Sequence, residues 1–338
     1  MTSTARGSLV LVAGSGRSGT STFAGLLQRL GYHVPQPEVP PDATNPRGFA
    51  ESQWVVDFHT RLLGAAGVQV ADARPAAWPL AARAGLADGV RHELTAWLAE
   101  QLGEHEHLVV KDPRLTWFLP LWRRCAADLG VSPRCVTMVR HPAAVIDSKH
   151  RWYGGRTGTV ARAAGWLNMM LYTERATRDT PRLFVSYDAL LDDWTRCVAE
   201  AGERLDLAPV RDAPATALRT AYEFVDRALS RSSTDWESLE LPAALRDQAE
   251  TAWDLLALLA AGDPRASADR LDAARAAYVE LYAEAEAIAT SSIVASRRRS
   301  RRPAPAAPAP ARLVRRVPVR YRRRIPLRWR RRIVRALA

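Results

Sequence analysis

The sequence predicts an α/β protein in which a parallel sheet is flanked by helices and the C-terminal part is mostly helical. Segments with helical spacing alternate with short apolar runs, as expected for a sheet covered on both faces. The length of 338 residues suits a domain that buries a core without disulfides or metal. The apolar runs are typical of strands buried on both faces and cover residues 9–13, 108–110, 134–139 and 182–185.

The elements follow in order along the chain. The first strand (LVLVA, 9–13) leads into the glycine-rich loop GSGRSGTS (14–21), and a helix is expected over 20–30. A proline-rich loop follows at 35–46. The later segments with helical spacing cover residues 51–63, 86–102, 116–129, 142–152, 159–178 and most of 188–291.

Charge divides the chain into an acidic body and a basic tail. Residues 297–338 hold 17 arginines and no acidic residue, whereas the rest of the chain has 31 basic and 36 acidic residues. We therefore predict a domain over 1–290, a Pro/Ala/Arg-rich linker over 291–311 and a basic tail over 312–338. The linker is expected to be extended from residue 296 because of its Pro-Ala repeats.

The tail has the pattern of a basic amphipathic helix. Trp329, Ile333 and Leu337 recur every four residues, with arginines between them. Such a helix suits an anionic membrane surface. No zinc-binding or helix-turn-helix motif accompanies it, so we expect no specific nucleic-acid binding.

We expect a cytoplasmic protein that the tail attaches peripherally to the inner face of a membrane. The first residues lack a long apolar core with a cleavage site, and no run approaches the eighteen apolar residues of a spanning helix. The three cysteines (Cys125, Cys135 and Cys197) are an odd number without CxxC spacing, which favours a reducing compartment.

The loop at 14–21 predicts an anion site. Its place between a strand and a helix directs backbone N–H groups and the positive end of the helix dipole at a ligand. Gly14 and Gly19 have the spacing of a P-loop, but Thr20 occupies the position of the lysine that a nucleotide kinase requires. The cation here is Arg17, whose planar guanidinium can grip an oxyanion in bidentate fashion. The loop therefore favours a P-loop-like fold that binds phosphate or sulfate without hydrolysing ATP.

A second anion site is predicted after the strand at 134–139. Arg140 lies at the carboxyl end of this strand, where open α/β sheets bind ligands. Pro142 suits the first turn of the helix that follows, and Ser148 is eight residues after Arg140. Arg140 and Ser148 are therefore candidates for a second phosphate clamp.

With these motifs, residues 8–235 resemble sulfotransferases that use PAPS (3′-phosphoadenosine-5′-phosphosulfate). The loop GSGRSGTS resembles the family's 5′-phosphosulfate loop, and VRHPAAVIDS (139–148) resembles its 3′-phosphate motif. The segments NPRGFAES (45–52), VVKDPRLTWFLPLW (109–122) and FVSYDALL (184–191) also fit bacterial members. The resemblance implies transfer of a sulfuryl group, without metal, to a hydroxyl acceptor such as a carbohydrate, glycolipid or other envelope metabolite.

The resemblance also implies residue roles. Arg140 and Ser148 would hold the 3′-phosphate, and Lys111 would place a cation near the sulfuryl group or its bridging oxygen. The 5′-phosphosulfate would be held by Arg17, Ser18, Gly19, Thr20 and Ser21.

The catalytic base is less clearly marked. Animal cytosolic members place a histidine two residues after a comparable lysine, where this chain has Pro113. Other members use a glutamate, so the first candidate is Glu51, followed by Glu38 and Asp112. Glu51 could instead be an N-terminal helix residue that complements the dipole, and Asp112 could belong to a structural turn with an internal ion pair. His141 is not expected to reach the acceptor.

Two other functions remain open: a P-loop kinase, and a non-catalytic protein that binds polyanions or membranes.

Two weaker sequence features could also contribute to the site. Trp152 and Tyr153 could stack on adenine, but aromatic residues at a helix end favour a core position. Residues 226–233 could close over the nucleotide or form a solvated helix end.

Overall fold

The computed structural model describes residues 7–87, 89–154, 157–225, 235–237 and 239–301. The chain divides into two compact units, Met1–Tyr282 and Ala283–Ala338. In the second unit, the described residues are the last part of one long helix. The predicted tail helix and the segment 226–233 lie outside the described residues.

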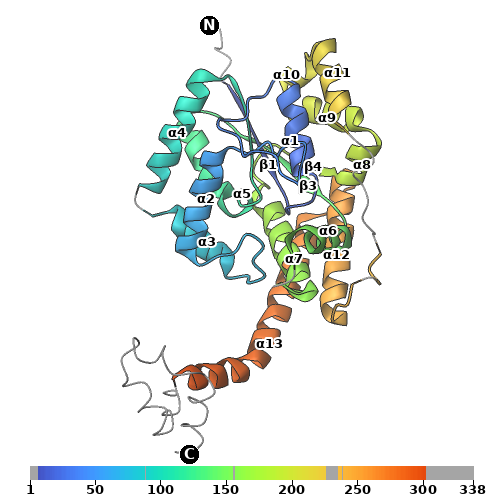
Figure 1. The fold of residues 1–338 in the computed structure, drawn as a ribbon. Helices are drawn as coiled ribbons and strands as arrows, with labels where there is room; N and C mark the ends of the chain where they lie inside the picture. Colours follow the sequence, from blue (N-terminus) through green and yellow to red (C-terminus); the bar gives the residue numbers. More distant parts are fainter. Residues whose placement is uncertain (1–6, 88, 155–156, 226–234, 238, 302–338) are drawn as a thin grey trace, which may run out of the picture. The chain divides into compact units, whose positions relative to one another are not determined.

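The first unit is built on a four-stranded parallel sheet, as predicted (Figure 1). The strands stand in the order β2-β1-β3-β4. Their bounds are Ser8–Ala13 for β1, His107–Lys111 for β2, Arg134–Val139 for β3 and Arg182–Ser186 for β4.

Helices cover the sheet and make up the C-terminal part of this unit, which confirms the predicted fold class. The first seven are α1 (Thr20–Arg29), α2 (Gln53–Ala66), α3 (Ala77–Gly85), α4 (Val90–Glu104), α5 (Leu115–Asp128), α6 (Pro142–Tyr153) and α7 (Thr159–Ala176). The others are α8 (Tyr187–Asp192), α9 (Trp194–Arg204), α10 (Ala208–Arg211), α11 (Ala215–Phe224), α12 (Ala243–Ala260) and α13 (Ala268–Arg301). No helix among the described residues is long and apolar enough to cross a membrane.

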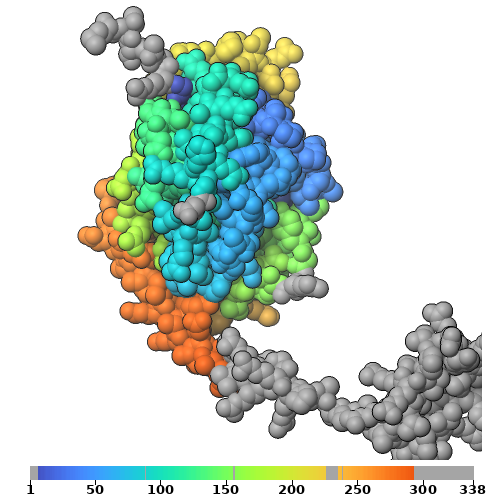
Figure 2. All heavy atoms as spheres, turned by 90° about the vertical axis from the view of Figure 1, so that its left-hand side faces the viewer, coloured from blue at the N-terminus to red at the C-terminus, as the bar shows by residue number. Residues whose placement is uncertain are grey.

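Successive side chains of β1 point to opposite faces of the sheet and belong to two separate core clusters. Leu9, Leu11 and Ala13 pack in one cluster with residues of α2 to α5, whose outer surface forms a continuous layer in Figure 2. Val10 and Val12 point the other way and pack with residues of α1, α9, α10 and α11. All five side chains are fully buried, as the period of two in a strand requires.

The strand order places a crevice at the carboxyl ends of β1 and β3. The chain leaves β1 toward β2 on one side, whereas it leaves β3 toward β4 on the other. Ligands of open α/β sheets bind where the strand order reverses in this way. The loop after β1 and Arg140 after β3 therefore meet at this crevice.

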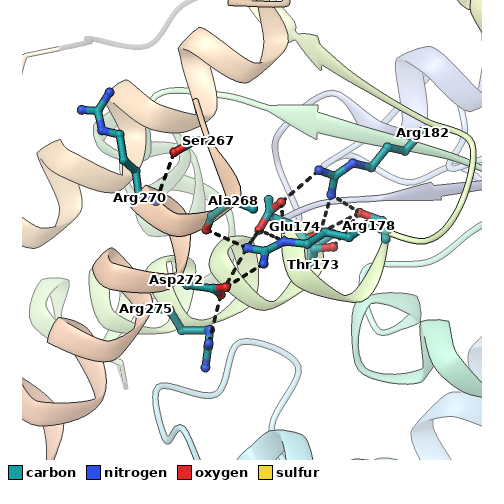
Figure 3. A network of polar contacts seen from close by, with 10 residues as sticks. Thr173, Glu174, Arg178, Arg182, Ser267, Ala268, Arg270, Asp272 and Arg275 are labelled. Carbon is teal, nitrogen blue, oxygen red and sulfur yellow. Dashed lines mark hydrogen bonds and ion pairs between the residues drawn. The ribbon is translucent and has the colours of Figure 1, made fainter. Parts of the chain in front are cut away.

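A buried carboxylate ties α13 to the sheet. Glu174 near the end of α7 is fully buried and binds Arg178 and Arg182, the residue that begins β4 (Figure 3). Arg178 also binds Asp272 of α13 at 2.8 Å. This network joins three elements that are distant in sequence.

Three local predictions differ from the structure. α2 begins at Gln53, because Ala50 has a positive φ of 50° and Ser52 is extended as the N-cap. The unpredicted helix α3 begins at Ala77 and accepts Pro79 in its first turn, where backbone N–H groups have no helical partner. Residues 296–301, expected to be extended, continue α13, since arginine favours helices and the first proline comes at 303.

Candidate active site

Glycines shape the loop between β1 and α1. Gly14 and Gly19 have φ values of 127° and 87°, which other residues rarely adopt. A Cβ on Gly14 would lie 2.6 Å from the carbonyl oxygen of Met138, and one on Gly19 would lie 2.2 Å from the ring of Tyr187. Both positions therefore require glycine, which lets the loop pass close to β3 and to Tyr187.

The start of α1 presents backbone N–H groups that have no partner within the helix. Its N-cap is Gly19, and no side chain caps the helix. Thr20, Ser21 and Thr22 form the first turn and line the neighbouring cavity. The Oγ of Ser18 is buried and makes no hydrogen bond with the described residues. These donors are suited to an oxyanion at the positive end of the helix dipole.

The two predicted anion sites are in direct contact. Arg17, with a positive φ of 76°, donates from Nε to the Oγ of Ser148 at 2.9 Å. Its Nη1 donates to the carbonyl oxygen of Thr44 at 3.1 Å. Arg140 donates from Nη1 to the carbonyl oxygen of Arg17 at 2.9 Å. The structure thus brings together Arg17, Arg140 and Ser148 at the crevice between β1 and β3.

Lys111 and Glu51 form an ion pair beside the same loop. Lys111 ends β2, and its Nζ donates to a Glu51 carboxylate oxygen and to the Oγ of Ser21 at 3.0 Å. Both members of the pair are buried. Burial raises the pKa of Glu51 above its usual value; Lys111 opposes this, and the charge of Asp112 adds to it. Glu51 precedes α2, so it is not an acid of the helix's first turn.

Asp112 belongs to a buried structural network. Its carboxylate pairs with Arg114 at 2.9 Å and accepts a hydrogen bond from Nδ1 of His59 at 3.1 Å. Trp122 donates to Nε2 of His59, which fixes the neutral tautomer with its proton on Nδ1. Burial alone would raise the pKa of Asp112, but His59 and Arg114 hold it below its usual value. These contacts match the turn with an internal ion pair.

The candidate Glu38, and His141, which was not expected to reach the acceptor, have other partners. Glu38 accepts hydrogen bonds from Gln28 at 2.6 Å and Gln36 at 3.1 Å. His141 is the N-cap of α6, where its side chain accepts from the backbone N–H of Ala143. Neither Glu38 nor His141 lines the cavity described next.

A cavity of about 840 Å³ opens at the crevice, with side chains from the loop, β2, α6 and α7 around it. We call it the cationic cavity, since eight of its lining residues are basic and Glu51 is its single acidic residue among those described. Both lysines of the chain are among the eight, although lysine supplies only two of its 48 basic residues. The basic residues are Arg17, Arg47, Lys111, Arg114, Arg140, Lys149, Arg151 and Arg162.

Sequence reasoning missed part of this lining. Tyr187 packs against Gly19 and lies under the guanidinium of Arg140, with 4.3 Å between the guanidinium carbon and the ring centroid. Tyr187 could have been identified from its position within the segment FVSYDALL (184–191), which resembles the sulfotransferase family. Trp152 and Tyr153 are 42% and 59% exposed and line the cavity, so the core position expected for them is wrong. Both stand at the C-terminal end of α6, beyond the reach of the sheet's core.

Two sulfotransferase domains of known structure are similar to this chain. No model of a protein family matches the chain, and no curated protein matches it. The fold is similar to the sulfotransferase domain of the Synechococcus PCC 7002 olefin synthase, with 19% identity and a TM-score of 0.44 over 74% of this chain and 94% of that one. It is also similar to a sulfotransferase domain of the curacin biosynthetic pathway, with 14% identity and a TM-score of 0.41 over 74% and 98% of the two chains.

Proposed function

We propose that the protein is a PAPS-dependent sulfotransferase that transfers a sulfuryl group to a hydroxyl acceptor. The observation that carries this proposal is the contact between two anion sites, Arg17 with Ser148 and Arg140 with the loop, beside the Lys111–Glu51 pair. A donor with a phosphosulfate and a separate phosphate needs two such sites. The sequence motifs of the PAPS-dependent family fall on these same residues.

The loop fits the 5′-phosphosulfate of this donor. Within the described residues, the buried hydroxyl of Ser18 has no hydrogen-bond partner and no side chain caps the first turn of α1, so an oxyanion could supply both sets of partners. Arg17 adds a fixed positive charge, while Arg140 and Ser148 would hold the 3′-phosphate. Tyr187 lies between Gly19 and Arg140, and its ring would hold the guanidinium of Arg140 in place for the phosphate.

When bound, the donor supplies the sulfuryl group. Glu51 would take the proton of the acceptor hydroxyl, for which a carboxylate with a raised pKa is a stronger base than an ordinary one. The ammonium group of Lys111, with three donors, can bind Glu51 and Ser21 and still stabilise negative charge that develops beside the loop. This reaction requires no metal, because the charges are met by Arg17, Arg140, Lys111 and backbone donors.

The acceptor and the location of the enzyme are further parts of the proposal. A carbohydrate, glycolipid or other envelope metabolite would meet the enzyme at the inner face of a membrane. The basic tail over 312–338 would attach it there through its arginines and apolar residues.

Binding of adenosine 3′,5′-bisphosphate tests the two-site arrangement. Calorimetry in metal-free buffer should show tight binding to the wild-type chain and at least tenfold weaker binding to Arg140→Ala, since a charge-assisted contact to phosphate is lost. Arg124→Ala is the matched control, because Arg124 is exposed and does not line the cavity. Preference for ATP with Mg²⁺, unaffected by Arg140→Ala, would contradict the proposal and favour the kinase alternative.

A further inference from the structure

Among the basic residues of the cationic cavity, Lys149 and Arg162 have no acidic partner within the described part of the chain, and the proposed donor site does not use them. Lys111 pairs with Glu51, Arg114 with Asp112, and Arg151 with Asp147. Arg17 and Arg140 form the linked anion sites, and Arg47 donates to the backbone carbonyls of Glu223 and Phe224. Lys149 and Arg162 remain.

Lys149 is held beside the phosphate loop by a neutral partner. Its Nζ donates to the Oγ of Ser15, a fully buried hydroxyl, at 3.1 Å. Burial and the positive charge of Arg162 lower the pKa of Lys149 to about 8. Lys149 is half-buried, and no acidic residue in the described part of the chain pairs with its ammonium group.

Arg162 is held in place by backbone oxygens. It is 7% exposed and donates from Nε to the carbonyl oxygen of Thr157 at 2.9 Å and from Nη2 to that of Gly154 at 2.6 Å. Its Nη1 makes no hydrogen bond with the described part of the chain. A rigid guanidinium with an unused donor group is suited to an oxyanion.

The two lysines lie on different sides of the phosphate loop. Lys111 ends β2, whereas Lys149 belongs to α6, which follows β3, and β1 with its loop stands between these strands. The base candidate Glu51 is paired with Lys111, and the phosphate contacts are assigned to Arg17, Arg140 and Ser148. Lys149 and Arg162 thus add positive charge to the cavity beyond what these contacts use.

We propose that Lys149 and Arg162 form a subsite for a carboxylate or phosphate group of the acceptor, so that the acceptor is an anionic hydroxyl compound. This inference rests on the proposed function. An anion between the two side chains would relieve their mutual repulsion and satisfy the unused donor of Arg162. The subsite would thereby orient the acceptor in the cavity.

Nuclear magnetic resonance can test the subsite directly, because the chain has only two lysines. Lysine labelled with carbon-13 at Cε gives one signal for Lys111 and one for Lys149, and Lys149→Met assigns them. The chemical shift of each Cε is measured as a function of pH in the free protein and in the protein saturated with adenosine 3′,5′-bisphosphate. Each titration is repeated after addition of methyl phosphate or acetate. The two probes distinguish a phosphate group from a carboxylate.

We expect a probe to raise the pKa of Lys149 by about one pH unit or more with the bisphosphate already bound, since a nearby anion favours the ammonium form. The Lys111 signal should not respond to the probe. Arg162→Met should raise the pKa of Lys149 in the free protein and weaken probe binding at least tenfold. Arg124→Met, with its exposed site outside the cavity, should match the wild type.

Three outcomes would overturn the subsite. If the bisphosphate alone raises the pKa of Lys149 and the probes add nothing, Lys149 is a donor contact. If only Lys111 responds, the probe occupies the transfer position. If neither probe changes Lys149, no anion binds there. Failure of the bisphosphate to bind at all would instead contradict the proposed function, and the response of Lys149 to the probes would still report on the subsite.

Discussion

At Glu51, a buried carboxylate and a buried ammonium are held together beside the phosphate loop. The pair keeps Lys111 against Ser21, so the proposed base and the charge near the departing phosphate are positioned by one another. Burial raises the pKa of the carboxylate and makes it more basic, while the positive charge of Lys111 opposes this rise and favours the ionised form. The pair therefore has both properties that proton abstraction at this site requires.

Replacing Glu51 should remove the base and leave donor binding intact. Glu51→Gln is expected to lower the rate of sulfuryl transfer about 10²–10⁴-fold, with affinity for adenosine 3′,5′-bisphosphate within about twofold of the wild type. In the wild type, kcat/KM should fall on the acid side with an apparent pKa above the ordinary glutamate value, because protonated Glu51 cannot accept a proton. A variant that keeps both the rate and the acid limb would exclude Glu51 as the base.

Individual site residues could be predicted only where they belong to a recognisable sequence motif. Arg17, Arg140 and Ser148 stand at fixed positions around a strand end, and the structure brings them into contact. Lys149 follows Ser148 directly, yet its contact with Ser15 depends on a loop that is distant in sequence. Arg162 could not be distinguished from the other arginines in the sequence, because its contacts with Gly154 and Thr157 form only in the folded chain.

At the scale of elements, the Glu174 network fixes how α7, β4 and α13 pack. Glu174 is buried between Arg178 and Arg182, and Arg178 continues to Asp272 (Figure 3). The arginines Arg178 and Arg275 lower the pKa of Asp272 to about 2. Removing one member of a buried ion pair costs more than the pair itself contributes, because the other charge stays buried.

Glu174→Gln should therefore destabilise the protein by about 3 kcal/mol. Urea unfolding measures this loss, and the matched control is Glu200→Gln, whose pair with Arg204 is exposed to solvent. The control should lose less than about 1 kcal/mol. Equal losses in the two variants would show that the network does not hold these elements together.

The elements themselves were predictable where their periodicity was clear. The four strands are short and mostly apolar, and helical spacing is visible in several of the segments between them. The helix α3 was missed because the alanines and prolines around residues 73–85 show no clear period. The start of α2 was misplaced by two residues, since the backbone of Ala50 and the pairing of Glu51 with Lys111 end the loop there.

For the whole molecule, charge separates a body that we propose binds small anions from a basic tail that we propose binds an anionic surface. We expect the full-length chain to sediment with phosphatidylglycerol vesicles and not with phosphatidylcholine vesicles, and to release as salt rises. Trp329→Glu together with Ile333→Glu should abolish this binding and leave bisphosphate affinity unchanged. Binding that persists in this double variant would mean that the apolar positions of the tail do not contact the membrane.

Detection of the transferred sulfuryl group tests the central claim most directly. The chain is incubated with PAPS, excess EDTA and a pool of neutral and anionic hydroxyl compounds, and mass spectrometry follows formation of adenosine 3′,5′-bisphosphate and of sulfated product. We expect both to form in equal amounts, and Glu51→Gln and Arg140→Ala to suppress both while Arg124→Ala does not. Contradiction would come from PAPS that stays intact across the pool while ATP is consumed when Mg²⁺ replaces EDTA.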